Sequence, residues 1–464
     1  MSKAGALSAL VAVTLFALGG CTLFQSEQRA QRPLDVPQRW QQTAPPPVTG
    51  TAVAQSANWW TAFNDPQLDR LIDDALRTNN NLAAAGIRVR RAQLQAGLAN
   101  TNLSPDVLGQ ASTSRSYDLK RGSVAGSASS SAVTLNYELD LWGRLAALRS
   151  AADWELKATE SDREAAALSL VGTAAGLYWQ IGYLNQRIAL SEAGMEDGRR
   201  ILALVRVKYA AGAVSGLDVA QAGQNLATQE AAHTQLLQQR VEARNALAIL
   251  FDQPPEPMAA EPAQLPDTAL PAIDAGVPAS LLARRPDLRA AEQRLRGALA
   301  HVDATRTGFY PALSLTGALG TSSTALGELL KNPVATLGAG LTLPFLQWNT
   351  ARLTVAVSQT QYEEAVAGFR QSLYTALSEV ENALSSRTQL RAESQSLSLA
   401  LQEAQRAERL SEVRYRAGAT ALQPVLDAKD RRRAAEASLA QNRLNQLNAT
   451  MTLYRALGGA ATAS

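Results

Sequence analysis

The chain has 464 residues, of which 46% are apolar and 18% charged, and its formal net charge is +3. This apolar content supports a packed core and argues against wholesale disorder. The near-neutral charge, without a helix-turn-helix or zinc-finger pattern, argues against a nucleic-acid partner. The single cysteine excludes a disulfide framework and a thiolate metal cluster.

The first 20 residues have the organisation of a bacterial signal peptide. Lys3 precedes an apolar run over 9–18, which is too short to span a membrane as a mature helix. The tetrapeptide LGGC at 18–21 resembles a lipobox, in which signal peptidase II cleaves before a cysteine that receives lipid. We therefore expect a signal peptide over 1–20, lipidation of Cys21 with palmitate, and sorting to the outer membrane.

Proline placement divides the rest of the chain. Five prolines between 33 and 47 predict an extended tether, so we read 21–64 as a lipid-anchored, extended N-terminal segment. Seven prolines from Pro254 to Pro278 predict an irregular linker over 253–285. Beyond the signal region no window approaches 18 uninterrupted apolar residues, so no mature transmembrane helix is expected.

The chain contains an internal repeat with an offset of 206 residues. This shift superposes Pro105 on Pro311 and Trp142 on Trp348 without a gap, and eight of the 24 positions between 82 and 105 are identical. The offset is far too long for a solenoid unit, so it indicates duplication of a large unit.

Each repeat is predicted to contain a helix, two strands and two long helices. The first repeat, 65–252, is expected to form a helix at 65–100, strands at 105–116 and 131–141, and helices at 143–209 and 216–251. The second, 286–458, is expected to form a helix at 286–306, strands at 311–321 and 335–346, and helices at 349–416 and 421–457. A tail follows at 459–464.

The strand at 131–141 alternates apolar and polar residues. Its odd-numbered residues, from Val133 to Leu141, are expected to face lipid. Its even-numbered residues should face water, and the second repeat shows the same pattern. The residues expected to line a water-filled lumen are Thr134, Asn136, Glu138, Asp140 and Thr342. A soluble sheet would also explain the alternation, but the lipobox argues against it.

The strand count predicts an assembly of several chains. Four strands cannot close a transmembrane barrel, and an open sheet in lipid would leave bare edges. Three chains with four strands each would form a twelve-stranded barrel. Helices of about 67 residues extend roughly 100 Å, so the expected fold is mainly α with membrane β: a trimeric β-barrel continued by a long periplasmic α-helical barrel.

Several motifs together resemble those of a known family. The segment WWTAFNDPQL at 59–68 is similar to a WW..F.DP.L motif. DLWGR at 140–144, RPDL at 285–288 and RYRAG at 414–418 also match in order and spacing. The chain resembles the lipoprotein branch of the TolC/OprM/NodT outer membrane factors, which act in resistance–nodulation–division efflux systems.

This resemblance implies a homotrimer without cofactors, located in the outer membrane and extending into the periplasm, with the linker in an equatorial region. It also implies a periplasmic adaptor (membrane fusion) protein and an inner-membrane resistance–nodulation–division pump as partners. The function implied is an exit duct that passively conducts small toxic compounds or drugs, and hence antibiotic resistance. The sequence does not identify the substrate.

The resemblance also assigns roles to the two turns between the long helices. These turns form the pump-facing tips, and the residues expected at the adaptor-docking surface are Gly212, Ala213, Leu217, Asp218, Gly418 and Ala419. Asp427 occupies the position of an aspartate ring that narrows the closed pore in relatives, and three carboxylates around one axis attract cations. Relatives carry arginine three residues later, where this chain has Asp430. We therefore predict a periplasmic gate at Asp427 and Asp430 without the usual arginine.

Other functions fit the sequence less well. An enzyme is not expected, because the only histidines, His233 and His301, have no partners at metal-ligand spacing and no catalytic motif is present. No metal site is expected either. An outer-membrane conduit for protein (type I) secretion and a lipid-anchored coiled-coil structural lipoprotein without a pore remain as alternatives.

Overall fold

We describe a computed structural model of the chain that covers residues 34–42, 58–255, 261–273, 275–324 and 326–459. The predicted signal peptide and Cys21 lie outside these residues, as does most of the predicted tether. The chain divides into two compact units. The first contains 88–160 and 290–371, and the second contains 36–87, 161–289 and 372–464. In the part of the chain described, no helix has the length and apolar content needed to cross a membrane.

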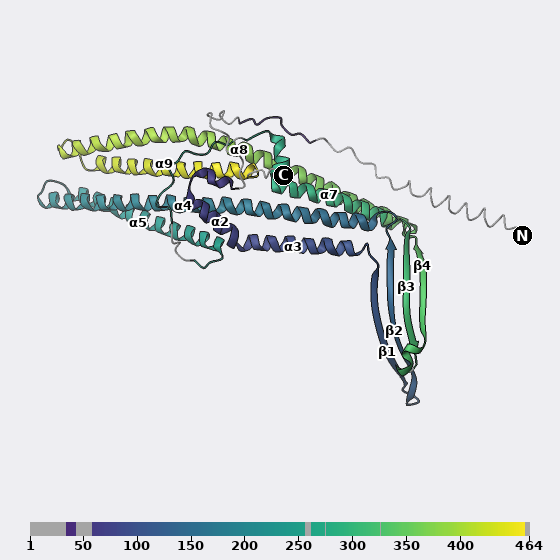
Figure 1. Cartoon of the computed structure of the whole chain (residues 1–464). Helices are drawn as coiled ribbons and strands as arrows, with labels where there is room; N and C mark the ends of the chain where they lie inside the picture. The colour runs from purple at the N-terminus through teal and green to yellow at the C-terminus, as the bar shows by residue number, and fades with distance from the viewer. Residues whose placement is uncertain (1–33, 43–57, 256–260, 274, 325, 460–464) are drawn as a thin grey trace. The chain divides into compact units, whose positions relative to one another are not determined.

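The first unit contains one four-stranded antiparallel sheet in the order β1-β2-β3-β4. In Figure 1 the four strands lie side by side, with the hairpin turns at the end remote from the helices. The pairing of β2 with β3 joins the two repeats into one sheet. The strands are β1 (Asp106–Asp118), β2 (Ser123–Leu139), β3 (Ala312–Ser323) and β4 (Pro333–Thr342).

Strand β2 begins at Ser123, eight residues before the predicted strand at 131–141, and so includes most of the Gly/Ser-rich stretch at 121–130 between the two predicted strands. The Gly/Ser-rich stretch pairs with β1, and the Oγ atoms of Ser112 and Ser130 lie 2.9 Å apart. The hydroxyls of Thr113 and Ser129 form a second such contact at 3.0 Å. Cross-strand hydroxyl pairs of this kind stabilise sheets, so a composition typical of loops forms a strand here.

The helical part of the first unit packs through small side chains. It contains segments of α3 (Asn80–Thr101), α4 (Arg144–Ala210), α7 (Pro286–Thr307) and α8 (Trp348–Arg416). The buried side chains on these segments include Ala92, Ala151, Ala158, Ala304 and Ala351. Small residues allow close helix approach. Trp142, just before α4, fixes the helix–sheet junction because its Nε1 donates to the Pro311 carbonyl at 2.7 Å.

The second unit contains α2 (Pro66–Thr78), α5 (Gly216–Ala248), α9 (Gln423–Ala456) and the remaining parts of α3, α4, α7 and α8. The expected single helix over 65–100 is wrong, because the chain breaks at Asn79, whose backbone is extended. Asn79 Oδ1 accepts from Leu82 N at 3.1 Å and so caps the start of α3. The expected irregular linker also ends early, since Pro278–Ser280 forms a 3-10 turn and Leu281–Arg284 forms α6.

The core of the second unit is built around aromatic residues. A 3-10 turn at Trp59–Phe63 places Trp59 against Tyr454 of α9, with ring centroids 4.8 Å apart. Phe63 packs on Trp179 of α4, with ring centroids 4.9 Å apart. The last helix, α9, joins this cluster through Ala440, Leu444, Leu447, Met451 and Tyr454, which recur every three or four residues.

Side chains from several helices hold the linker against the second unit. Arg443 of α9 donates to the carbonyls of Pro266 at 2.8 Å and Thr268 at 2.5 Å. The other contacts to linker carbonyls are Asn185 Nδ2 to Pro262 O at 2.9 Å, Arg387 Nη2 to Pro271 O at 3.1 Å and Trp40 Nε1 to Gly276 O at 2.9 Å. The linker is therefore held by both repeats and by the N-terminal segment.

Candidate functional site

The strand register sorts the sheet into two chemically different faces. Val133 lies opposite Leu319, and Leu135 lies opposite Val107. Because directly opposed residues share a face, the apolar alternation of β2 extends across all four strands. Further members of this face are Tyr137, Leu313, Leu315, Leu337 and Leu341, and Leu337 is 91% exposed.

The opposite face is mostly polar or small, although it also contains Leu108 and Val334. Asn136 lies opposite Thr316, which in turn lies opposite Gly338. A Cβ atom at Gly338 would lie 2.8 Å from the Thr316 Oγ1, so a side chain there would require Thr316 to move. The same face contains Thr134 and Thr342, whose strand partners are Ala318 and Ala312. The arrangement gives a sheet with an apolar face and a hydrophilic face, as a membrane pore wall needs.

Two of the expected lumen residues have additional partners near the helices. Glu138 forms a bidentate pair with Arg144 at the start of α4, with O–N distances of 2.8 and 2.9 Å. The expectation that Asp140 continues the polar face of the strand is wrong, because β2 ends at Leu139. The Asp140 carboxylate instead accepts from Leu145 N at 3.0 Å and Ala146 N at 2.8 Å, and so caps α4.

The turns at the ends of the two long helix pairs have the same geometry. Gly212 and Gly418 adopt φ values of +68° and +71°. The following residues complete the same hydrogen-bond pattern, with Ala213 N donating to Lys208 O at 2.8 Å and Ala419 N donating to Arg414 O at 2.9 Å. These are Schellman motifs, which require the left-handed residue that glycine tolerates best.

The predicted docking residues on these turns differ in their chemistry. Leu217 is 66% exposed, and Ala213 on the same turn and Ala419 on the other turn are also exposed. The Asp218 carboxylate is already engaged, because it accepts from Ser215 N at 2.9 Å and Ser215 Oγ at 2.7 Å in a capping box. These hydrogen bonds from Ser215 lower the pKa of Asp218. A small apolar core of Val205, Ala222, Leu422 and Leu426 lies behind both turns.

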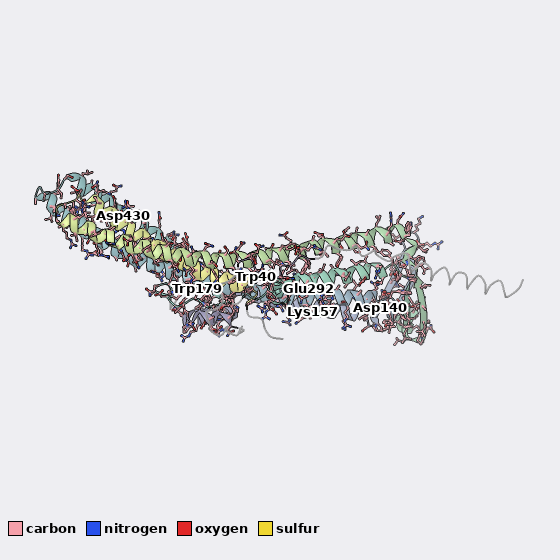
Figure 2. All side chains as sticks on the ribbon, turned by 90° about the horizontal axis from the view of Figure 1, so that it is seen from above. Trp40, Asp140, Lys157, Trp179, Glu292 and Asp430 are labelled. Carbon is pink, nitrogen blue, oxygen red and sulfur yellow. The ribbon has the colours of Figure 1, made fainter. Side chains whose placement is uncertain are left out.

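The two predicted gate aspartates lie one turn apart on α9. Asp427 is half-buried and accepts from Gln423 Nε2 at 2.6 Å. Asp430 is exposed, accepts from Asn225 Nδ2 of α5 at 2.8 Å, and pairs with Arg433. Figure 2 shows Asp430 toward the end of the long helices, away from Trp40 and Trp179. Asp430 thus has a cation partner in Arg433, three residues further along α9, while the gate assignment itself stays a prediction.

A cluster of six charged side chains lies beside the gate aspartates and joins α4, α8 and α9. Its members, here called the tip ion cluster, are Asp197, Glu408, Glu412, Lys429, Arg432 and Glu436. Lys429 is 7% exposed, and its Nζ lies 2.9 Å from Asp197 Oδ2, 3.1 Å from Glu408 Oε1 and 2.7 Å from Glu412 Oε1. Arg432 pairs with Glu408 and, at 2.7 Å, with Glu436.

The tip ion cluster holds four carboxylates and two cations, so it depends on both cations to stay assembled. Burial would lower the pKa of Lys429, but its hydrogen bonds to Asp197, Glu412 and Glu408 outweigh burial and raise it. Lys429 therefore stays charged at every physiological pH. Removing one partner from a buried ion pair leaves an uncompensated charge, which makes this lysine the central contact between α9 and its neighbours.

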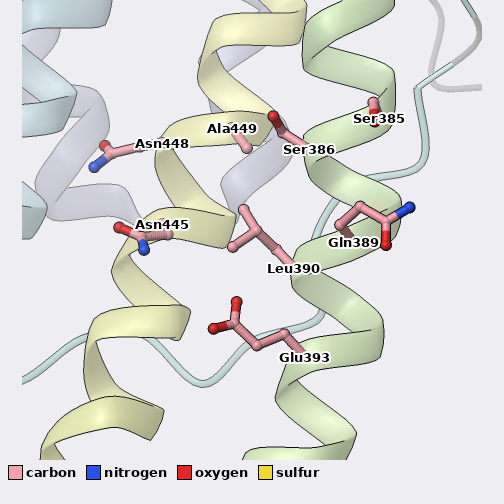
Figure 3. A pocket seen from close by; sticks show the side chains of 8 residues that line it. All are labelled: Ser385, Ser386, Gln389, Leu390, Glu393, Asn445, Asn448 and Ala449. Atoms are coloured by element: carbon pink, nitrogen blue, oxygen red, sulfur yellow. The ribbon is translucent and has the colours of Figure 1, made fainter.

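A polar hollow of about 460 Å³ lies between α8 and α9, farther from the turns. Figure 3 shows Ser386 and Leu390 directed from α8 toward α9, with Glu393 below them. Asn442, which is buried on α9, donates to Leu390 O at 3.1 Å and Glu393 Oε2 at 2.7 Å. Buried asparagines fix helix register, so these contacts align α8 with α9. Among the described residues, no group of His, Cys, Asp and Glu side chains could hold a metal ion.

Comparison with known proteins identifies the family to which this chain belongs. The sequence profile described as outer membrane efflux protein matches residues 71–251 and 277–459. The chain belongs to the outer membrane efflux protein family. It is 33% identical to the pyoverdine export outer membrane protein OpmQ of Pseudomonas putida, over 91% of this chain and 92% of OpmQ.

Two further likenesses agree with this family assignment. The toxin and drug export protein A of Aggregatibacter actinomycetemcomitans is 30% identical, over 87% of this chain and 88% of that protein. The solved open state of the Neisseria gonorrhoeae outer membrane channel MtrE superposes with a TM-score of 0.81 and 29% identity, over 93% of this chain and 97% of MtrE.

The efflux channel therefore has the fold expected from its sequence: a trimeric twelve-stranded β-barrel to which each chain contributes four strands, continued by an α-helical barrel. It functions in the outer membrane as an efflux channel. Family members of this kind form trimers and act in tripartite pumps. The family is one of channel proteins rather than known enzymes.

Sequence reasoning missed the tip ion cluster. Asp197, Glu408 and Lys429 are far apart in the sequence, and each reads as an ordinary charged residue on a helix. One signal was available: Lys429 lies about one helical turn from the apolar residues Val425 and Leu426, where a charged side chain needs partners. Asp427 and Asp430 were predicted from the sequence, but their hydrogen-bond donors Gln423 and Asn225 were not.

Proposed function

We propose that this efflux channel is the passive exit duct of a tripartite pump, with a water-filled lumen lined by the polar sheet face. The observation that carries the proposal is the register, because Thr134, Asn136 and Glu138 share one face with the small residues Gly338 and Gly340. A face of this kind can line a water-filled pore, while the apolar face contacts lipid. No chemistry is required of the duct, since transport is driven elsewhere.

The periplasmic gate of the channel consists of Asp427 and Asp430. In a trimer, each would occur three times around the axis, and rings of carboxylates attract cations and hinder anions. Gln423 donates a hydrogen bond to the Asp427 carboxylate, and Asn225 donates one to the Asp430 carboxylate. These bonds fix the orientation of both carboxylates. The tip ion cluster then acts as the support of this gate, because it ties α9 to α4 and α8 beside the aspartates.

The partners of the channel are a periplasmic adaptor and an inner-membrane pump of the resistance–nodulation–division type. The exposed Leu217, Ala213 and Ala419 beside two rigid glycine turns offer the adaptor a small apolar surface at each tip. A lipid anchor on Cys21 would hold the N-terminal segment at the membrane, and Trp40 attaches that segment to the linker through Gly276.

The substrates are small toxic compounds or drugs rather than one specific ligand. Relatives are named for exporting pyoverdine and for exporting toxins and drugs, and these names give no single chemical class of cargo. A conduit accepts what its pump delivers, so the breadth of cargo is expected to come from the pump.

Reconstitution in planar bilayers tests the proposed duct. The purified full-length trimer should produce single-channel currents with cation preference. A spacer lipoprotein would give no current, which would refute the proposal. A photo-crosslinker at Leu217 should capture a periplasmic adaptor that is co-expressed with the channel. The matched control places the crosslinker at Leu108 in β1, where adaptor capture is not expected; equal capture at both positions would refute the docking assignment.

A further inference from the structure

The charges of the two β-hairpins are distributed unevenly along the sheet. Over 106–139 and 312–342, all basic residues lie near the hairpin turns: Arg115, Lys120, Arg121 and Lys331. Of the acidic residues, Asp106 and Glu138 lie at the opposite end, near the helices, whereas Asp118 and Glu328 lie near the turns. In this family fold the helices extend into the periplasm, so the hairpin turns reach the outer surface of the membrane. The basic residues therefore gather at the outer leaflet.

The turn between β1 and β2 leaves its cations available. Asp118 Oδ1 accepts from Lys120 N at 2.9 Å and from Arg121 N at 3.2 Å, so this carboxylate oxygen shapes the turn. Arg121 Nε lies 3.8 Å from Asp118 Oδ2, and the Arg121 side chain is 84% exposed. Lys120 is also exposed. With Arg115, the hairpin carries three cations and one carboxylate, a net charge of +2.

The same hairpin presents apolar and aromatic groups beside these cations. The register places Arg115 on the same face as Val133 and Leu135, the apolar face of the sheet. The register shifts after Ser116, but Tyr117 stays beside Arg115, whose Cζ lies 5.5 Å from the centre of the Tyr117 ring. Leu119, at the turn itself, is 96% exposed. Aromatic and basic residues together are typical of membrane–water interfaces.

The other hairpin provides an internal comparison. Lys331 Nζ lies 2.6 Å from Glu328 Oε1, so its one cation is paired and its net charge is zero. The exposed Leu330 nearby gives that hairpin an apolar residue but no free cation. The basic surface is therefore a property of the β1–β2 hairpin and not of every outward turn.

We propose that Arg115, Lys120 and Arg121 form a binding surface for the phosphorylated headgroup of a glycolipid in the outer leaflet. Arginine and lysine bind phosphate through charge-assisted hydrogen bonds. A free phosphate would pair with the cations but would leave Tyr117 and Leu119 without an apolar partner. A glycolipid has acyl chains that can cover the apolar face directly below the phosphates, so it fits both parts of the surface. This inference rests on the proposed pore orientation, with the apolar face toward lipid.

Glycolipid retention by the full-length trimer in nanodiscs tests this inference. The discs contain phospholipid with bisphosphorylated lipid A, and retained lipid A per trimer is counted by native mass spectrometry. The variant Arg115→Ser/Lys120→Ser/Arg121→Ser should bind at least tenfold more weakly, and roughly 100-fold more weakly if each cation contributes as basic residues do near anionic membranes. The control Lys331→Ser should bind like the unaltered channel.

Three outcomes would overturn the proposal. The triple variant could retain as much lipid A as the unaltered channel, dephosphorylated lipid A could bind equally well, or millimolar inorganic phosphate could displace the lipid as completely as excess lipid A does. Single-channel conductance in phospholipid bilayers distinguishes failure of this inference from failure of the proposed function. A conducting channel without glycolipid preference refutes only the binding surface, whereas absence of conductance in the unaltered channel refutes the duct.

Discussion

Replacing Lys429 with methionine should open the periplasmic end of the channel. The side chains are similar in size, so the substitution mainly removes the cation that Asp197, Glu408 and Glu412 surround at 2.7–3.1 Å. Breaking one partner of a buried ion pair costs about 3–5 kcal/mol. We expect a cost at the lower end of this range, about 3 kcal/mol, because the Asp197 and Glu412 side chains are about 30% exposed. A change of about 3 kcal/mol corresponds to roughly 100-fold in the equilibrium between closed and separated helices.

Two measurements check this expectation. Hydrogen–deuterium exchange of the amides in 423–436 should become roughly 100-fold faster in Lys429→Met, since these amides exchange through local opening. The fraction of time spent in high-conductance states in planar bilayers should also rise. The control Arg416→Met removes an exposed pair to Glu412 at 3.5 Å and should cost less than about 1 kcal/mol. Equal exchange rates in Lys429→Met and the unaltered channel would show that the cluster does not hold α9.

Three further outcomes are expected. Asp427→Ala should increase conductance and weaken cation preference in bilayers, and unchanged conductance and selectivity would contradict the gate assignment. Cys21→Ser should abolish labelling by radioactive palmitate; persistent labelling would contradict the lipobox. Burial would raise the pKa of Asp287, but the hydrogen bonds and the charge of Arg285 outweigh burial and lower this pKa below its ordinary value of 3.8. Ionised Asp287 therefore stabilises the folded channel above pH 3.8, and this stabilisation is lost as the pH falls further. The trimer melting temperature should therefore exceed that of Asp287→Asn at pH 6, and this difference should shrink below pH 4; a pH-independent difference would argue against the linkage.

The long helices were predictable because their ends carry strong local signals. Gly212 and Gly418 end α4 and α8 through a conformation that glycine tolerates, and periodic apolar residues continue up to these turns. The strand count was predictable from alternation, and the repeat then showed that each half contributes two strands. These are local properties, so one sequence contains enough information to read them.

The errors arose where a residue type has two uses. Asn79 and Asp140 were assigned to a helix and a strand, although asparagine and aspartate also cap helices, as both do here. The Gly/Ser composition of 121–130 is typical of loops, but Ser129 and Ser130 complete cross-strand hydroxyl pairs. The tip ion cluster was missed for a different reason: Asp197 and Lys429 are brought together only by the packing of the two repeats.

The way the linker is held has a consequence for how this channel can diverge during evolution. Arg443, Arg387 and Asn185 bind main-chain carbonyls of the linker, not its side chains. Every residue type supplies a carbonyl, and the carbonyls of Pro266 and Pro271 lie in a part of the linker that forms neither helix nor strand. Substitutions within the linker should therefore accumulate readily, while the donors on the helices should resist replacement. Related channels should accordingly differ most in the linker itself and least in the helix positions that contact it.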